Sequence, residues 1–274
     1  MNRRRMLVIA RTDLRQLRES PDFWVPMVIL AGLFFVVIPA FLLFAITHVG
    51  NTAVITKVAS TLDVLPPRAK AAIGGFTPAG RTSYALAVYL FAPLAVIVPM
   101  TISTAVGANA LVGEREKGTG EFLAYCPASE REIYLGKLIA SLLPGYVTTI
   151  VGFGIYALIV NLIVGPKVGG WFFPTTDWWV LMFWVVPPFL ALTIAVVLVL
   201  SARVRSGAAA QQASGLVTLP LIVLSYAQSS GVLLGAGQTA FAFGVVAWAA
   251  AIVGLHRGSR FVSRARLLGV EAAS

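Results

Sequence analysis

The sequence predicts an all-α integral membrane protein with six transmembrane helices and both termini in the cytoplasm. The 274-residue chain is 58% hydrophobic, and only 12% of its residues are charged, about half the charged fraction of a typical soluble domain. Long stretches without a charged residue follow one another along the chain, and the 21 Lys and Arg, which outnumber the 11 Asp and Glu, gather in the segments between them. This composition excludes a soluble enzyme and a disordered tail.

Residues 1–22 are expected to form an amphipathic helix on the cytoplasmic face of the membrane. At helical spacing, apolar residues form one stripe and the basic residues cluster on the opposite side. Asp13 falls within the apolar stripe and weakens the pattern. The basic residues are Arg4, Arg11, Arg15 and Arg18. Such a helix could couple movements at the inner face to the first span, and the alternative is a basic flank that only sets topology.

The transmembrane helices are expected in five stretches that contain no Asp, Glu, Lys or Arg. A helix needs about 20 apolar residues to cross a hydrocarbon core of about 30 Å. The stretches are 23–56, 82–113, 138–166, 178–202 and 206–256. The last can hold two spans, with the Gly-rich segment 228–237 as the turn between them. The predicted spans are 25–47, 84–111, 138–164, 178–200, 207–227 and 238–256. The fifth starts with small polar residues, so it is either tightly packed or a broken pair of short helices.

The orientation follows from the Lys and Arg residues in the connecting segments. With both termini inside, 16 of the 21 basic residues lie in cytoplasmic segments, including the tail 257–274. The positive-inside rule selects this orientation. We expect a multi-pass protein of the inner (plasma) membrane of the cell. The basic residues are scattered over four short segments and do not form one surface with stacking aromatic residues, which argues against a nucleic-acid partner. The longest outside loop, 48–83, is predicted to hold a short helix over 54–62.

The loop 113–137 is the most informative segment, because it is acidic on an otherwise basic face. Five of the eleven acidic residues lie here: Glu114, Glu116, Glu121, Glu130 and Glu132. Charge complementarity favours a docking surface for a basic cytoplasmic partner. Thr119 is expected to cap a short helix over 121–125 that Pro127 ends. Ser129 and Glu132 form a capping box that opens the third span.

This loop resembles the permease subunits of type-2 ATP-binding-cassette transporters. The pattern is a Glu-x-Glu, a Gly-Thr, a Glu-Phe-Leu, a Pro, an acidic pair and a Gly-Lys. The matching residues are Glu114, Glu116, Gly118, Thr119, Glu121, Phe122, Leu123, Pro127, Glu130, Glu132, Gly136 and Lys137. The six-span plan and the basic N-terminal helix are similar as well. Gly120 departs from the family, which more often has a bulky apolar residue, so the short helix is expected to start later or to be looser.

The resemblance implies a single permease domain over 1–274 that belongs to an exporter. It would pair with a second permease, identical or not, and with two separate cytoplasmic ATPase subunits that bind ATP and Mg²⁺. The loop 113–137 would be the coupling helix, and the matching residues would contact the ATPase. The chain has no G-x-x-x-x-G-K-[ST] phosphate loop, so it is expected to have no ATPase site and no cofactor of its own.

Two other classes of function are less well supported by the sequence. An ion-coupled secondary transporter usually keeps charged residues inside the membrane, and the predicted spans have none in their cores. An integral membrane enzyme lacks support because neither an H-E-x-x-H nor a G-x-S-x-G motif is present. One cysteine, Cys126, and two distant histidines predict no metal site. The substrate is not indicated, although a pathway without fixed charge suits a lipid, an apolar drug or a peptide.

Overall fold

Helices make up all the regular structure among the described residues, which confirms the all-α class. The computed structural model describes residues 2–49, 77–204, 206–216 and 237–261, together with Ala53, 55–57, Ser60 and Ile73. The first half of the chain contains α1 (Arg3–Glu19), α2 (Pro21–Gly32), a π-helical stretch (Leu33–Val37), α3 (Ile38–Phe44), a second π-helical stretch (Ala45–Val49), α6 (Pro78–Ala85), a third π-helical stretch (Leu86–Leu90) and α7 (Leu94–Glu116).

The rest of the chain begins with α8, the short helix of the predicted coupling loop. It contains α8 (Gly120–Tyr125), α9 (Glu130–Ile163), α10 (Gly165–Val168), α11 (Thr176–Val180), a π-helical stretch (Leu181–Val185), α12 (Val186–Arg203) and α14 (Gly237–Phe261). Residues 207–216 are helical as well. The predicted N-terminal helix over residues 1–22 is present as α1, Arg3–Glu19.

Four helical segments are long and apolar enough to cross a membrane: Pro21–His48, Pro78–Glu116, Glu130–Ile163 and Thr176–Arg203. They cover the first four predicted spans, so the chain is a multi-pass membrane protein. The predicted sixth span, 238–256, lies within α14. Most of the predicted fifth span, and most of the predicted helix over 54–62, lie outside the described residues. The total of six spans and their orientation stay predictions.

The membrane helices extend beyond their predicted limits because the charge-free pattern marks only the part that lies in hydrocarbon. The second segment ends at Glu116 instead of 111, and the third begins at Glu130 instead of 138. The start of α9 is set by its cap. The Ser129 hydroxyl oxygen accepts from the Glu132 amide at 3.3 Å, and the Glu132 carboxylate accepts from the Ser129 amide at 3.0 Å. The predicted capping box is confirmed.

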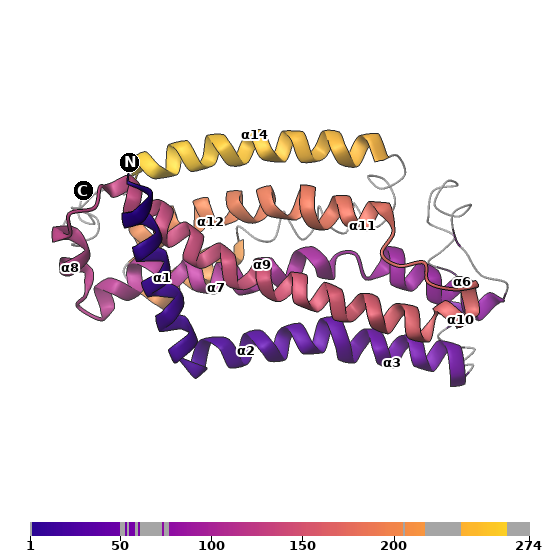
Figure 1. Cartoon of the computed structure of the whole chain (residues 1–274). Helices are drawn as coiled ribbons and strands as arrows, with labels where there is room; N and C mark the ends of the chain where they lie inside the picture. The colour runs from indigo at the N-terminus through magenta and orange to yellow at the C-terminus, as the bar shows by residue number, and fades with distance from the viewer. Residues whose placement is uncertain are drawn as a thin grey trace.

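The long helices lie side by side, and α1 crosses one end of them (Figure 1). The core is built by α7, which packs against α9 and α12, while α14 packs on α12 and α1 on α9. We call the end that carries α1 and α8 the α1 end, and the opposite one, with α6 and α10, the α10 end. A Cβ atom added to Gly145 of α9 would lie 2.6 Å from the Pro99 carbonyl oxygen of α7, so these two backbones are in close contact.

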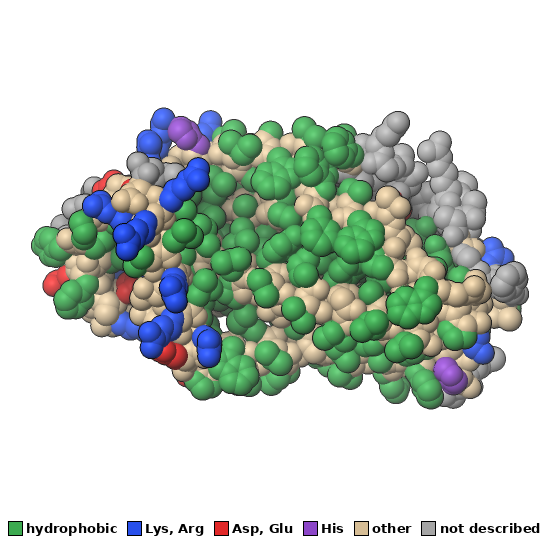
Figure 2. All heavy atoms as spheres, viewed as in Figure 1, with side chains coloured by type: hydrophobic (Ala, Val, Ile, Leu, Met, Phe, Trp, Pro, Cys, Tyr) green, Lys and Arg blue, Asp and Glu red, His purple; other side chains and the backbone are tan. Residues whose placement is uncertain are grey.

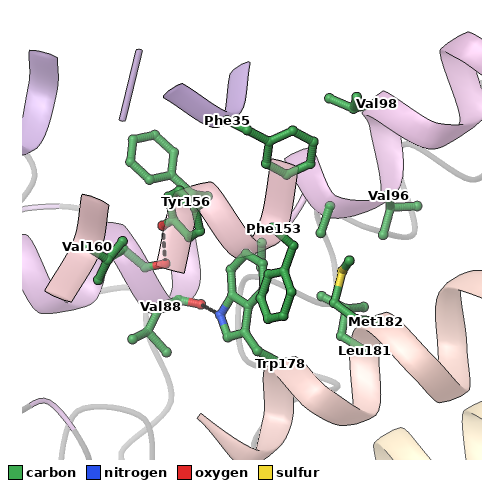
Figure 3. Close-up of a cluster of buried hydrophobic side chains, with 14 of the residues drawn as sticks. Phe35, Val88, Val96, Val98, Phe153, Tyr156, Val160, Trp178, Leu181 and Met182 are labelled. Carbon is green, nitrogen blue, oxygen red and sulfur yellow. Dashed lines mark hydrogen bonds between the residues drawn. The ribbon is translucent and has the colours of Figure 1, made fainter. Parts of the chain in front are cut away.

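An aromatic cluster fills the core toward the α10 end (Figure 3). Its Tyr156 hydroxyl donates to the Ala87 carbonyl at 2.6 Å, and its Trp178 ring N–H donates to the Val88 carbonyl at 2.8 Å. These carbonyls lie where the second span loses its regular hydrogen bonds, in a π-helical stretch followed by a turn before Pro93. Proline has no amide hydrogen to donate. The aromatic side chains therefore satisfy polar groups that would otherwise be unpaired in the membrane.

The surface has a broad apolar belt between two ends that carry charge (Figure 2). Large apolar side chains on α2, α3, α9 and α14 are exposed, among them Phe41, Leu162 and Val246. An apolar surface this wide is too costly in water and suits lipid chains. Lys and Arg gather over α1, next to the belt (Figure 2).

Candidate functional site

The α1 end brings together α1, the end of α7, α8 and the start of α9. Gly136 of α9 lets α1 lie close, because a Cβ atom there would be 2.9 Å from the Ile9 side chain and 3.0 Å from the Met6 carbonyl oxygen. The Glu132 carboxylate also accepts from the Asn2 amide, which fixes the first residue before α1. Four arginines of α1 remain exposed, as predicted: Arg4, Arg11, Arg15 and Arg18. Arg15 forms an ion pair with Glu19 at 2.8 Å.

A buried ion cluster joins α1, α7 and α9. The Lys137 ammonium lies 3.0 Å from the Asp13 carboxylate and 2.5 Å from the Glu114 carboxylate, and only 3% of the Lys137 side chain is exposed. Asp13 weakens the amphipathic pattern of α1 in the sequence, and the structure gives the reason for its place in the apolar stripe. It faces a cation on α9 that a helical wheel of α1 alone cannot show. Burial raises the pKa of Asp13 above its ordinary value, although Lys137 acts in the opposite direction.

The cluster extends to α8 through Thr119. The Thr119 hydroxyl donates to the Glu114 carboxylate, and it lies 3.2 Å from the Glu114 carbonyl oxygen. Thr119 occupies the N-cap position of α8 but makes no side-chain capping bond, so its predicted capping role is wrong. The turn before it uses Gly118, whose φ of 71° favours glycine. The expected late start of α8 is also wrong, because the helix begins at Gly120, which is buried.

A second set of contacts ties α7 to the segment that follows α12. The Glu116 carboxylate accepts from the Gly207 amide at 2.8 Å. The Arg115 guanidinium donates to the carbonyl oxygens of Ser201 and Val204 at 2.8 and 2.7 Å. Between α1, α7 and α9 lies a cavity of about 250 Å³, and its charged lining residues are Asp13, Glu114, Glu116, Lys117 and Lys137. The arrangement can position helices and transmit displacements between them.

The outer face of α8 carries two large exposed aromatic side chains. Phe122 is 80% and Tyr125 is 78% exposed, and Glu121 lies beside them on the surface. On the inner face, Ala124 is buried in a cluster that Leu123 and Cys126 join. The Arg5 guanidinium donates to the Pro127 carbonyl at 2.5 Å and ties α1 to the residues after α8.

The predicted coupling residues thus divide between the surface and the interior. Glu116, Gly118, Glu121, Phe122 and Pro127 are exposed; Glu114, Thr119, Leu123 and Glu130 are partly buried; Glu132 and Lys137 are buried. Because Glu132 and Lys137 are buried, they can affect a partner only indirectly, through the residues in or next to α1 and α7 that they contact. Tyr125 was missed as a candidate. Its spacing of three residues from Phe122 on a helix was the signal for a shared face.

Comparison with known proteins agrees with this architecture. No curated protein matches the chain closely enough to be compared with it. The family model described as ABC-2 family transporter protein matches residues 7–252, which include most of α1, the four long apolar segments, α8 and most of α14. Because this match covers most of the chain, the protein belongs to the ABC-2 transporter family and is a membrane permease of that type.

Proposed function

We propose that the chain is the permease subunit of an ATP-binding-cassette exporter of the inner membrane. Together with a second permease, identical or not, it forms the substrate pathway. The loop 113–137 couples this pathway to two separate cytoplasmic ATPase subunits, which hold ATP and Mg²⁺. Membership of the ABC-2 family supports a transport subunit without its own ATPase site.

The exposed pair Phe122 and Tyr125 carries the docking part of this proposal. Aromatic side chains are enriched at the centres of protein interfaces, where each can contribute 2 kcal/mol or more to binding. The helix α8 lies at the tip of the α1 end, beyond the apolar belt that lipid would cover (Figures 1 and 2). A cytoplasmic protein with an apolar pocket for the two rings and a basic rim for Glu121 is the partner that fits.

The ion cluster supplies a route from the docking helix to the membrane helices. Thr119 precedes α8 and bonds to Glu114 of α7, Glu114 pairs with Lys137 of α9, and Lys137 pairs with Asp13 of α1. A displacement of α8 by its partner would therefore move charges that are buried and tightly held. Because such charges are costly to separate, the connected helices are expected to move with α8.

Purification of the tagged chain from its native membrane tests the docking. We expect an ATPase polypeptide with a phosphate loop to co-purify with the wild-type chain. In the double variant Phe122→Ser with Tyr125→Ser, the amount of co-purified ATPase should fall about 30-fold or more. A 30-fold loss corresponds to about 2 kcal/mol of binding free energy. Trp171→Ser is the matched control, because Trp171 is 71% exposed but lies at the α10 end. Equal retention by the double variant and the control would contradict docking through α8.

Transport by the purified complex in vesicles tests the energy source. We expect export that requires ATP and stops when the ATPase subunits are removed. Export that persists without ATP and follows an ion gradient would identify a secondary transporter. ATP hydrolysis by the isolated chain would contradict the division of labour between permease and ATPase.

A further inference from the structure

A large apolar groove lies where α1, α2 and α9 meet, and Leu17 of α1 separates it from the cavity that holds the ion cluster. Its volume is about 770 Å³, within the range of about 300–1,000 Å³ that is common for small-molecule sites. Leu14, Leu17 and Arg18 of α1, Trp24 of α2, and Pro144 and Val147 of α9 line it. Figure 2 shows the surface hollowed beside the basic residues of α1.

The groove opens onto the surface that faces lipid. Trp24 is 45% and Val147 is 53% exposed, and Val28 and Val151 continue the apolar surface along α2 and α9. Water in a groove with this lining would form few hydrogen bonds, so filling it with an apolar group is favourable. The nearest abundant apolar groups are the acyl chains of the surrounding membrane.

The rim of the groove carries a positive charge where the apolar belt meets the basic residues of α1 (Figure 2). Arg18 is the one charged side chain among the described lining residues. Its neighbour on the sequence, Glu19, is already paired with Arg15. Arg and Trp side chains are both typical of the membrane interface, because each joins an apolar body to a polar tip.

We propose that this groove binds one acyl chain of an anionic glycerophospholipid, with Arg18 contacting the headgroup phosphate. The bound lipid fills the space between α1 and the first and third spans. It would thereby hold α1 against the membrane in the leaflet at the α1 end. The lining residues belong to α1, α2 and α9 and none to α8, so the site does not depend on the proposed ATPase partner.

Native mass spectrometry of the full complex in nanodiscs provides the test. The nanodiscs contain equal amounts of phosphatidylglycerol and phosphatidylcholine, and the phospholipid that stays bound after their disruption is counted. We expect one phosphatidylglycerol per chain. Val147→Trp should fill the groove and lower this occupancy about tenfold. The control Val151→Trp, one turn further along α9 and outside the groove, should retain the lipid.

The headgroup contact is tested by Arg18→Gln. In this variant the preference of the groove for phosphatidylglycerol over phosphatidylcholine should fall about fivefold. One basic residue near an anionic membrane surface contributes about 1 kcal/mol, which corresponds to this factor. Arg11→Gln removes the same charge from α1 outside the groove and should keep the preference. Free glycerol phosphate in excess should not displace the bound lipid, because it has no acyl chain.

Three results would overturn the proposal. The first is equal lipid retention by Val147→Trp and Val151→Trp. The second is retention of phosphatidylcholine as readily as phosphatidylglycerol by the wild-type chain. The third is that Val147→Trp changes the number of permease copies in the complex but leaves the amount of bound lipid unchanged. This result would show that a second copy of the chain covers the groove. Thermal unfolding of all variants confirms that each is folded.

Discussion

Lys137 organises the α1 end, because its ammonium lies between carboxylates from two other helices. Its side chain is 3% exposed, and among the described residues its charge is compensated by Asp13 and Glu114. The sequence identified Lys137 as part of a family pattern but not its partners, since Asp13 is 124 residues away and its contact depends on how α1 crosses α9. The same limit applies to Glu114. The sequence predicts that its carboxylate contacts a basic partner protein, whereas in the structure it pairs with Lys137 of the same chain.

Replacing Lys137 with Met should destabilise the protein strongly. The variant leaves two largely buried carboxylates without a cation, and breaking a buried ion pair in this way costs about 3–5 kcal/mol. Asp13→Asn should cost clearly less, because burial already raises the pKa of Asp13 and so disfavours its charged form. Lys117→Met is the control, since Lys117 is exposed. Thermal unfolding in nanodiscs measures all three, and the hypothesis fails if Lys137→Met unfolds at the same temperature as Lys117→Met.

At the scale of elements, sequence patterns placed the helices well and their ends less well. Charge-free stretches predicted the first four spans because hydrocarbon excludes charge, and Ser129 with Glu132 predicted the start of α9 because a capping box is a local motif. The remaining boundaries depend on neighbours. Glu116 ends α7 just beyond the charge-free stretch 82–113, where its carboxylate accepts from the Gly207 amide. The aromatic contacts around Ala87 and Val88 likewise required the fold, since their partners come from α9 and α11.

The contact between α1 and α9 should depend on Gly136. Gly136→Val would place side-chain atoms where Ile9 and the Met6 carbonyl already lie, so α1 must shift away from α9. Overpacking of this kind typically costs about 1–3 kcal/mol. Gly154→Val makes the same change in α9 where nothing lies within 4 Å of the added Cβ atom. Spin labels on α1 and α9 would report a longer distance for Gly136→Val alone; an unchanged distance in both variants would mean that α1 is held by other contacts.

The whole molecule separates its charges between two ends. The basic residues of α1, the end of α7, the start of α9 and the ends of α12 and α14 all lie at the α1 end, whereas Arg81 of α6 and Lys167 of α10 lie at the opposite one (Figure 1). The fold therefore brings together in space the described segments that are predicted to lie in the cytoplasm. This asymmetry supports the proposed orientation, because positively charged segments are retained on the cytoplasmic side.

Cys126 allows the orientation to be measured without a foreign label site, because it is the single cysteine of the sequence. It follows α8 at the α1 end and is partly exposed. A membrane-impermeant maleimide should leave it unlabelled in intact cells and label it in inverted membrane vesicles. The complementary variant combines Cys126→Ser with Trp171→Cys, which moves the thiol to an exposed position at the α10 end, and it should be labelled in intact cells. If Cys126 reacts from outside and Trp171→Cys from inside, the orientation is reversed. In that case α8 cannot reach a cytoplasmic ATPase, and the docking proposed for Phe122 and Tyr125 fails with it.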